Sequence, residues 1–285
     1  EKRWDGADLI FDLDADQIVR GPYAMMLARV KEETLKLIEM LTEELGFSRN
    51  RMRIVFSGGR GYHIHITDIA VLGWGSQERR EIVDYVCGIG LDPEMMLSSG
   101  GEPRGWRRRY TETLRGCLSH LAALDPAEAT ARLTGLEGIG KRTAAQFLAD
   151  AGALSRAPAE ELLQNRVVRA ITASPEFEKR LRDAGAHADE PVTTDIKRLI
   201  RTPGSLHGGS GMRVVPLDLH DLEDFDPLVD AVVFGDRDIR VDVKANFVAS
   251  MLGNTYTLKA GTQTVPEALA IYLCCRNTAE IAGGG

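Results

Sequence analysis

Residues 8–16, with the sequence DLIFDLDAD, place acidic side chains inside an apolar strand pattern. Residues two apart on a β-strand point to the same face, so Asp12 and Asp14 project together, about 6–7 Å apart along the strand. Two carboxylates this close resist ionising together, and a divalent cation with oxygen ligands removes that conflict. The run therefore indicates a metal site, with a solvent-facing strand edge as the alternative interpretation.

A glycine-rich loop joins two further strand patterns, Met52 to Phe56 and Tyr62 to Ile66. Glycines let the backbone approach a ligand closely, successive N–H groups attract anions, and arginine offers a planar fork to phosphate. The loop is not a Walker A motif, because it lacks Gly-Lys-Ser/Thr before a helix. The alternative interpretation is a hairpin turn beside a core histidine. The candidate phosphate-binding residues are Ser57, Gly58, Gly59, Arg60, Gly61 and His63.

Residues 189–208 combine a predicted helix with a group of cations. Asp189 is placed to cap a helix that ends near Ile200, before Pro203. Cations at a helix C-terminus can simply offset the helix dipole, which accounts for Arg198 better than for the side chains that follow. Those side chains are Arg201, Ser205 and His207.

The net charge of −7 weighs against a protein that coats nucleic acid, but it permits an enzyme with a local basic cleft. The 285 residues are enough for one large domain or two ordinary ones. No apolar run is long enough to cross a bilayer, and none resembles a signal peptide. The cysteines form no C-x-x-C pair, which argues against a zinc ribbon or a disulfide framework and favours a cytoplasmic protein.

The order of the patterns predicts an α/β body interrupted by a helical insertion. Helix patterns run from Met25 to Leu45 and from Gln77 to Val86, and mainly helical segments fill residues 92–188. Strand patterns return after Thr202, and a final helix is expected from about Pro266 to Glu280.

Two motifs in the insertion point to nucleic acid. Residues 133–148 resemble a helix-hairpin-helix, whose Gly-Ile-Gly turn exposes backbone N–H groups to a DNA phosphate, although such turns are also used simply to pack two helices. Residues 104–110 interleave cations and aromatics, as single-strand binders do, and a solvated helix start is the alternative. The candidate DNA contacts of the turn are Gly138, Gly140, Lys141 and Arg142.

Three ordered stretches resemble the catalytic small subunit of archaeal DNA primases, within the archaeo-eukaryotic primase superfamily: ADLIFDLDAD, FSGGRGYHIHITD and DEPVTTDIKRLIRTPGSLHGG. With the connecting helix and the C-terminal VPEALAIYLCCRNTAEI, the resemblance covers most of the chain outside the insertion. It implies an α/β (α+β) catalytic domain with a mixed or antiparallel central sheet, in residues 1–91 and 189–285. The family has further residues before the aspartate strand, so we expect an N-terminal portion to be missing from this sequence.

The resemblance also implies the site. In the family an aspartate pair and a third aspartate bind two divalent ions, Mg²⁺ or Mn²⁺, which here implies Asp12, Asp14 and Asp189. Asp195 competes for the third position, and the spacing to the later cations favours Asp189. The residues implied to bind the nucleotide phosphates are Ser57, Arg60, His63, Arg201 and His207, with His63 close to the reaction.

The implied activity is template-dependent nucleotidyl transfer, which makes short RNA primers from NTPs on single-stranded DNA and releases pyrophosphate. A large primase subunit is the implied partner. Two alternatives stay open: a repair-type primase-polymerase that prefers dNTPs, and a non-catalytic helix-hairpin-helix DNA-binding module. Many relatives carry a zinc-binding group after the aspartate strand, but residues 17–35 contain neither Cys nor His, so we expect no structural zinc.

Overall fold

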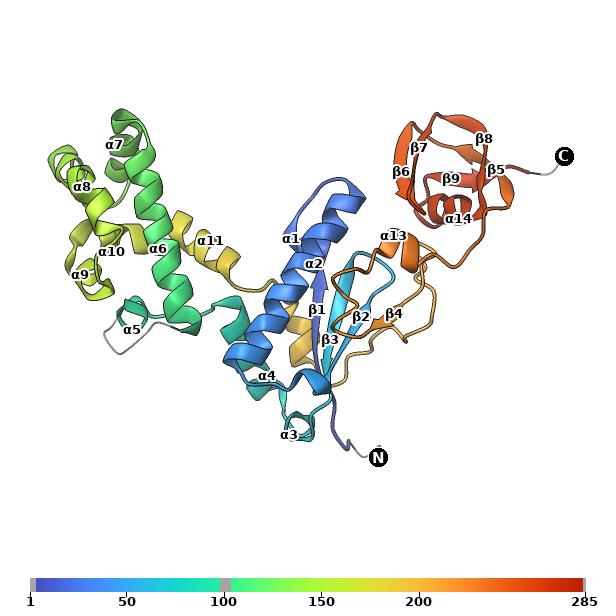
Figure 1. Ribbon diagram of the computed structural model, residues 1–285, viewed down its shortest axis with the longest axis horizontal. Helices are drawn as coiled ribbons and strands as arrows, with labels where there is room; N and C mark the ends of the chain where they lie inside the picture. Colours follow the sequence, from blue (N-terminus) through green and yellow to red (C-terminus); the bar gives the residue numbers. More distant parts are fainter. Residues whose placement is uncertain (1–3, 98–103, 284–285) are drawn as a thin grey trace. The chain divides into compact units, whose positions relative to one another are not determined.

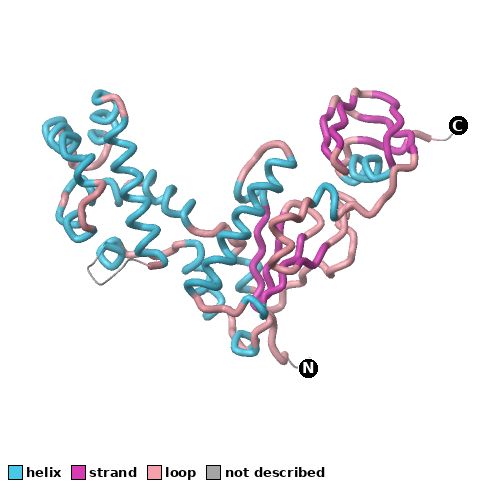
Figure 2. Tube along the Cα trace, in the orientation of Figure 1, coloured by secondary structure: helices cyan, strands magenta, loops and turns pink. Residues whose placement is uncertain are grey.

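The computed structural model describes residues 4–97 and 104–283, and the chain forms two compact units. One unit combines Glu1–Val83 with His187–Gly285, and the other is Asp84–Ala186. Among the described residues, every β-strand belongs to the first unit (Figure 1), whereas the second is helical (Figure 2). This combination of strands and helices confirms the predicted α/β fold class.

A four-stranded antiparallel sheet forms the centre of the first unit (Figure 1). Its strands are β1 (Leu9–Asp14), β2 (Met52–Phe56), β3 (Gly61–Ile66) and β4 (Val215–Leu217), in the order β1-β3-β2-β4. The apolar side chains of β1 at alternate positions are fully buried, whereas Asp12 and Asp14 between them stay partly exposed. The register places Asp12 opposite His63 and Asp14 opposite Gly61. The sheet therefore brings the aspartates beside the strand that leaves the glycine loop.

Helix α2 (Tyr23–Glu39) packs against β1 and β3. Its buried residues recur at helical spacing, as in Val30, Leu37 and Ile38, so one apolar stripe covers the sheet. The helix continues as a π-helical turn, Met40–Glu44, which brings its end close to the predicted Leu45. The other helical segments before the second unit are α1 (Ala15–Ile18), a 3₁₀ turn (Arg49–Arg51) and α3 (Ile69–Leu72). Helix α4 (Ser76–Cys87) contains Asp84, the first residue of the second unit.

Helix α12 (Glu190–Thr194) is much shorter than predicted, and the expected extension to Ile200 is wrong. Asp195 has an extended backbone, φ −86° and ψ 99°, and its carboxylate accepts a hydrogen bond of 2.9 Å from the N–H of Lys197. Val-Thr-Thr is β-branched and a poor helix former, so a local turn at Asp195 ends the helix. The cations beyond it lie on irregular chain that leads to β4.

The C-terminal part of the first unit has its own apolar core. Strands β5 (Asp238–Val243), β8 (Gly261–Pro266) and β9 (Ala279–Ile281) form one sheet, and β6 (Phe247–Met251) pairs with β7 (Asn254–Leu258). The helices of this part are α13 (Pro227–Asp230) and α14 (Glu267–Cys275). The predicted end of the last helix at Glu280 is wrong, because Asn277 adopts a φ of +57° and β9 follows.

The second unit is made of helices joined by short turns. They are α5 (Pro93–Leu97), α6 (Gly105–Ala123), α7 (Pro126–Thr134), α8 (Lys141–Leu154), α9 (Ala159–Gln164), α10 (Arg166–Thr172) and α11 (Pro175–Ala184). Trp106 and Tyr110 of α6 are buried, so their rings cannot stack on bases, and the interpretation of residues 104–110 as a single-strand binder is wrong. In the described part of the chain, no helix combines the length and apolar character needed to cross a membrane.

Candidate active site

Three aspartates influence one another at β1. Burial, together with the charges of Asp14 and Asp189, raises the pKa of Asp12 to about 6, although the charges of Arg201 and Arg198 act to lower it. The backbone N–H of Asp189 donates a 2.8 Å hydrogen bond to the backbone carbonyl of Asp12, which ties the start of α12 to β1. This mutual repulsion is the condition that a divalent cation relieves, so the donor set fits Mg²⁺ or Mn²⁺.

Asp189 and Asp195 differ in what their carboxylates do. Asp189 occupies the N-cap position of α12 but makes no side-chain cap hydrogen bond, so its carboxylate is not used by the helix. The carboxylate of Asp195 accepts the N–H of Lys197, and Asp195 is not among the groups that shift the pKa of Asp12. Of these two aspartates, only Asp189 is among the groups whose charge raises the pKa of Asp12.

His63 lies beneath the surface, next to Asp12. Its side chain is 3% exposed, and Nε2 is 3.6 Å from Asp12 Oδ1. Burial, together with the charges of His65 and Arg201, lowers the pKa of His63 to about 4, although the charge of Asp14 acts to raise it, so the ring is neutral near pH 7. The register pairs His63 with Asp12 across β3 and β1, and contact of His63 with the nucleotide phosphates stays a prediction.

A pocket of about 280 Å³ opens beside Asp14. It is lined by the glycine loop and by the segment after α12, which are well separated in the sequence. Among the described residues that line it, three are arginines and only Asp14 is acidic, in a chain whose net charge is −7. Such a local excess of cations favours an anionic ligand. The lining residues are Asp14, Tyr23, Ser57, Gly59, Arg60, Arg201, His207, Gly209, Ser210 and Arg276.

Ser57 organises the glycine loop. Its hydroxyl accepts hydrogen bonds from the N–H groups of Gly59 and Gly61, at 3.3 and 3.2 Å. Gly58 has a φ of +74°, and a Cβ on Gly61 would lie 2.1 Å from the carbonyl oxygen of Leu13, so these positions need glycine. Two of the loop's amides thus point at Ser57 rather than into the pocket. The donors that face a ligand are mainly side chains.

His207 presents a proton to the pocket. Its Nδ1 accepts a 3.2 Å hydrogen bond from the N–H of Gly209 and lies 3.2 Å from the hydroxyl of Ser210; the bond from Gly209 favours the tautomer with the ring proton on Nε2. A Cβ on Gly59 would lie 3.0 Å from that Nε2, so the ring tip lies against the loop. Burial lowers the pKa of His207, and the charges of Arg201 and Arg60 lower it further. His207 is therefore a neutral donor.

Two side chains that the sequence analysis did not identify form hydrogen bonds with the backbone of the glycine loop. The hydroxyl of Tyr23 donates to the carbonyl oxygen of Gly59, and the hydroxyl of Ser210 donates to that of Gly58. Ser210 is 3% exposed and also accepts the N–H of Met212 at 3.2 Å. The Gly-Gly-Ser-Gly sequence after His207 was the available signal for Ser210; Tyr23, at the start of α2, had none.

Comparison with known proteins decides the family. Residues 11–219 match the family model described as DNA primase small subunit. A protein named DNA primase small subunit PriS from Methanosphaerula palustris is 55% identical over 100% of this chain and 77% of its own length. The chain belongs to the DNA primase small subunit family. Proteins of the same name from Methanoregula boonei and Methanocorpusculum labreanum are 56% and 53% identical, over 99% and 100% of this chain and 77% and 76% of their own lengths.

Membership confirms the predicted enzyme class. Small subunits of DNA primase are the catalytic primases that synthesise primers for replication, so the chain is a nucleotidyltransferase. The primase family generally depends on divalent metal ions. The pocket beside Asp14 and the aspartates of β1 lie within the matched residues, except that Arg276 comes from the C-terminal part beyond them.

The helix-hairpin-helix candidates of this primase lie between α7 and α8. Gly138 has a φ of +73°, Gly140 caps α8, and Lys141 and Arg142 are exposed on its first turn. Arg166 donates a 2.9 Å hydrogen bond to the carbonyl oxygen of Gly138 and so braces the turn. The turn has the expected hairpin form, and its contact with DNA stays a prediction.

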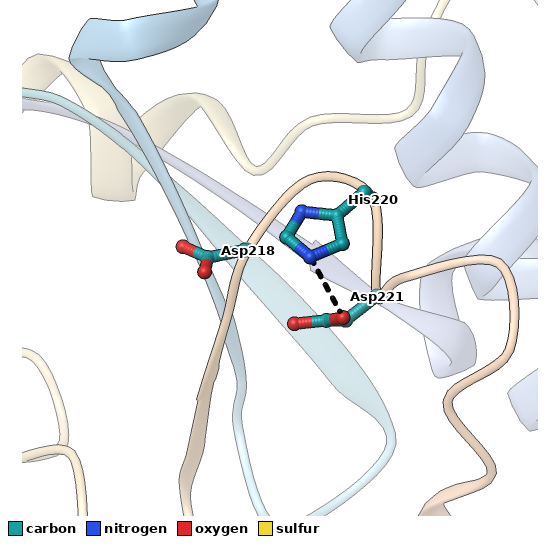
Figure 3. Close-up of side chains that lie close together, drawn as sticks. All are labelled: Asp218, His220 and Asp221. Carbon is teal, nitrogen blue, oxygen red and sulfur yellow. Dashed lines mark ion pairs between the residues drawn. The ribbon is translucent and has the colours of Figure 1, made fainter.

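A different group of potential metal ligands lies on the loop after β4 (Figure 3). The ligand atoms of Asp218, His220 and Asp221 all lie within 4.8 Å of one another, and His220 Nε2 is 3.1 Å from Asp221 Oδ1. Among the described residues no other group of three such side chains is this close, so the carboxylates of Asp12, Asp14 and Asp189 are more widely spaced. All three loop residues are exposed, and exposed acidic groups are common without a bound ion.

Proposed function

We propose that this primase chain extends a primer on single-stranded DNA, with the triphosphate of the incoming nucleotide in the pocket beside Asp14. The main support for this proposal is the composition of the pocket. Three arginines and a neutral histidine donor line it, and they come from the glycine loop, from residues 201–210 and from the end of α14. A triphosphate is highly anionic, and guanidinium forks are suited to its oxygens. The hydroxyl of Ser57 fixes the glycine loop that carries Arg60.

Asp12, Asp14 and Asp189 are the residues that would hold Mg²⁺ or Mn²⁺. When bound, such ions neutralise charge on the transferring phosphate and make the primer 3′-hydroxyl more acidic. The support for the third ligand is the effect of Asp189, and not of Asp195, on the pKa of Asp12. His63 is proposed to keep Asp12 in place from below, because it is neutral, buried and 3.6 Å from that carboxylate.

Three finer parts of the function are proposed from the names of the relatives and from the second unit. Ribonucleotides are the proposed substrates, because the relatives are named DNA primases. A large subunit is the proposed partner, because they are named small subunits. The hairpin before α8 is proposed to contact template phosphates through its amides, Lys141 and Arg142, which are exposed.

The deciding experiment measures nucleotide incorporation on single-stranded DNA with Mn²⁺ or Mg²⁺, using labelled NTPs and dNTPs in parallel. We expect ribonucleotide incorporation that Asp14→Asn abolishes without loss of DNA binding. A strong preference for dNTPs would favour the repair-type polymerase. DNA binding by the unaltered chain, with no incorporation of either nucleotide, would favour the non-catalytic module and overturn the proposal.

A further inference from the structure

Arg276 follows α14 and is stacked on two tyrosines. Its guanidinium carbon lies 5.1 Å from the ring centre of Tyr23 and 5.4 Å from that of Tyr272, and the two rings are 5.8 Å apart. Tyr272 is 3% exposed and belongs to the core of the C-terminal part, against which Tyr23 also packs. The aromatic faces therefore fix the plane of the guanidinium through cation–π contacts.

Stacking uses the faces of a guanidinium and leaves its N–H edge unused. Within the described part of the chain, no hydrogen bond or ion pair engages the side chain of Arg276. By contrast, Arg60 in the same pocket has ion pairs with Asp16 and Asp14, at 2.5 and 3.8 Å. The two tyrosine rings thus hold the guanidinium of Arg276, and its N–H groups have no carboxylate partner among the described residues.

The position of Arg276 explains what those donors can reach. Its side chain lines the pocket beside Asp14, together with Arg60, Arg201 and His207. It also lines a neighbouring pocket of about 770 Å³, which shares Tyr23 and Arg60 with the first. Arg276 therefore lies where the two pockets adjoin. Among the described residues of the C-terminal part, Arg276 alone lines the pocket beside Asp14.

Tyr23 connects this stack to the glycine loop. The same side chain that supports Arg276 donates its hydroxyl proton to the carbonyl oxygen of Gly59. The ring of Tyr23 thus fixes two donors of one pocket relative to each other: the loop that carries Arg60, and the guanidinium of Arg276.

We propose that Arg276 is a nucleotide-binding residue that contacts the phosphate tail of the incoming NTP, and that Tyr23 and Tyr272 are positioning residues that hold it. The inference rests on the proposed placement of the triphosphate in this pocket. It adds a cation from outside the glycine loop and the segment after α12. It also makes the C-terminal part of the chain a component of the nucleotide site.

The test is equilibrium binding of an NTP and of the matching NMP, in the presence of Mn²⁺, to the full chain and its variants. Arg276→Ala should weaken NTP binding roughly tenfold, as expected for one charge-assisted contact of about 1.4 kcal/mol, and should change NMP binding little. Arg276→Lys keeps the charge but loses the flat stack, so it should show an intermediate loss. Arg240→Ala is the matched control, since Arg240 is an exposed arginine of β5 that lines neither pocket.

Two further variants separate positioning from folding. Tyr272→Leu removes one aromatic face and should reproduce part of the loss of NTP binding expected for Arg276→Ala. Tyr272→Phe keeps the aromatic face and should retain the NTP binding of the unaltered chain. Arg60→Ala tests the pocket itself. If Arg60→Ala weakens NTP binding and Arg276→Ala does not, the inference about Arg276 is wrong while the proposed function stands. If neither changes NTP binding, the triphosphate lies elsewhere and both fail.

Discussion

Asp12 shows a conflict between stability and catalysis at a single residue. Its folded pKa of about 6 lies above the ordinary value of 3.8, because burial and two neighbouring carboxylates oppose its charge. Ionising the Asp12 carboxyl in the folded state therefore lowers the free energy of unfolding. This loss is absent below pH 3.8, grows as the pH rises to 6, and reaches its full value above pH 6. At about 1.4 kcal/mol per pKa unit, this shift corresponds to at most about 3 kcal/mol.

We therefore predict that Asp12→Asn abolishes primer synthesis yet raises the free energy of unfolding in EDTA. The gain should appear between pH 4 and pH 6 and then level off, because asparagine removes the charge at nearly constant volume. Urea unfolding at several pH values measures it. Adding Mn²⁺ should stabilise the unaltered chain more than the variant. A variant less stable than the parent at pH 7 in EDTA would contradict this account of Asp12.

The arginines of the pocket give a second prediction at this scale. Arg60→Ala or Arg201→Ala should raise the NTP KM by roughly ten- to a hundredfold, since each removes a charge-assisted contact worth about 1.5–3 kcal/mol. Steady-state incorporation on an oligonucleotide template measures the change. Arg213→Ala is the matched control, because Arg213 is exposed nearby and does not line the pocket. An unchanged NTP KM in both arginine variants would show that the triphosphate does not bind in this pocket.

At the scale of elements, the short helix α12 separates two aspartates. It ends at Thr194, so Asp189 precedes the helix beside β1 and Asp195 follows it in a turn. We predict that Asp189→Asn abolishes incorporation and weakens Mn²⁺ binding, whereas Asp195→Asn retains both. Calorimetry with Mn²⁺ and an incorporation assay check the pair. Loss of activity in Asp195→Asn alone would reverse the assignment of the third ligand.

The elements around the site differ in how far the sequence specifies them. Strand β1, the glycine loop and β3 were predictable, because alternation and glycine are local signals that burial of the sheet reinforces. The end of α12 was not, because the turn at Asp195 competes with a helix over the same residues. The position of Asp12 opposite His63 likewise depends on the pairing between β3 and β1, which the local sequence does not specify.

At the scale of the molecule, the hardest features to predict were contacts between distant segments. Tyr23 on Gly59, Ser210 on Gly58 and Arg276 at the pocket are each ordinary residues in their local sequence. Only the fold brings them together, and no spacing rule joins α2 or α14 to the glycine loop. Of the three arginines of the pocket, the resemblance implied Arg60 and Arg201, whereas Arg276 had no signal in a chain whose net charge is −7.

The helical second unit gives the last prediction. If its hairpin holds template, Lys141→Glu with Arg142→Glu should weaken single-stranded DNA binding and reduce the magnitude of its salt slope by about 1–2, because fewer counterions are released. NTP binding should not change, since that pocket is built from residues of the other unit. Lys179→Glu with Arg182→Glu on α11 makes the same charge change on a helix outside the hairpin and controls for net charge. Equal salt slopes in the two double variants would indicate that the hairpin packs α7 against α8 and does not bind the template.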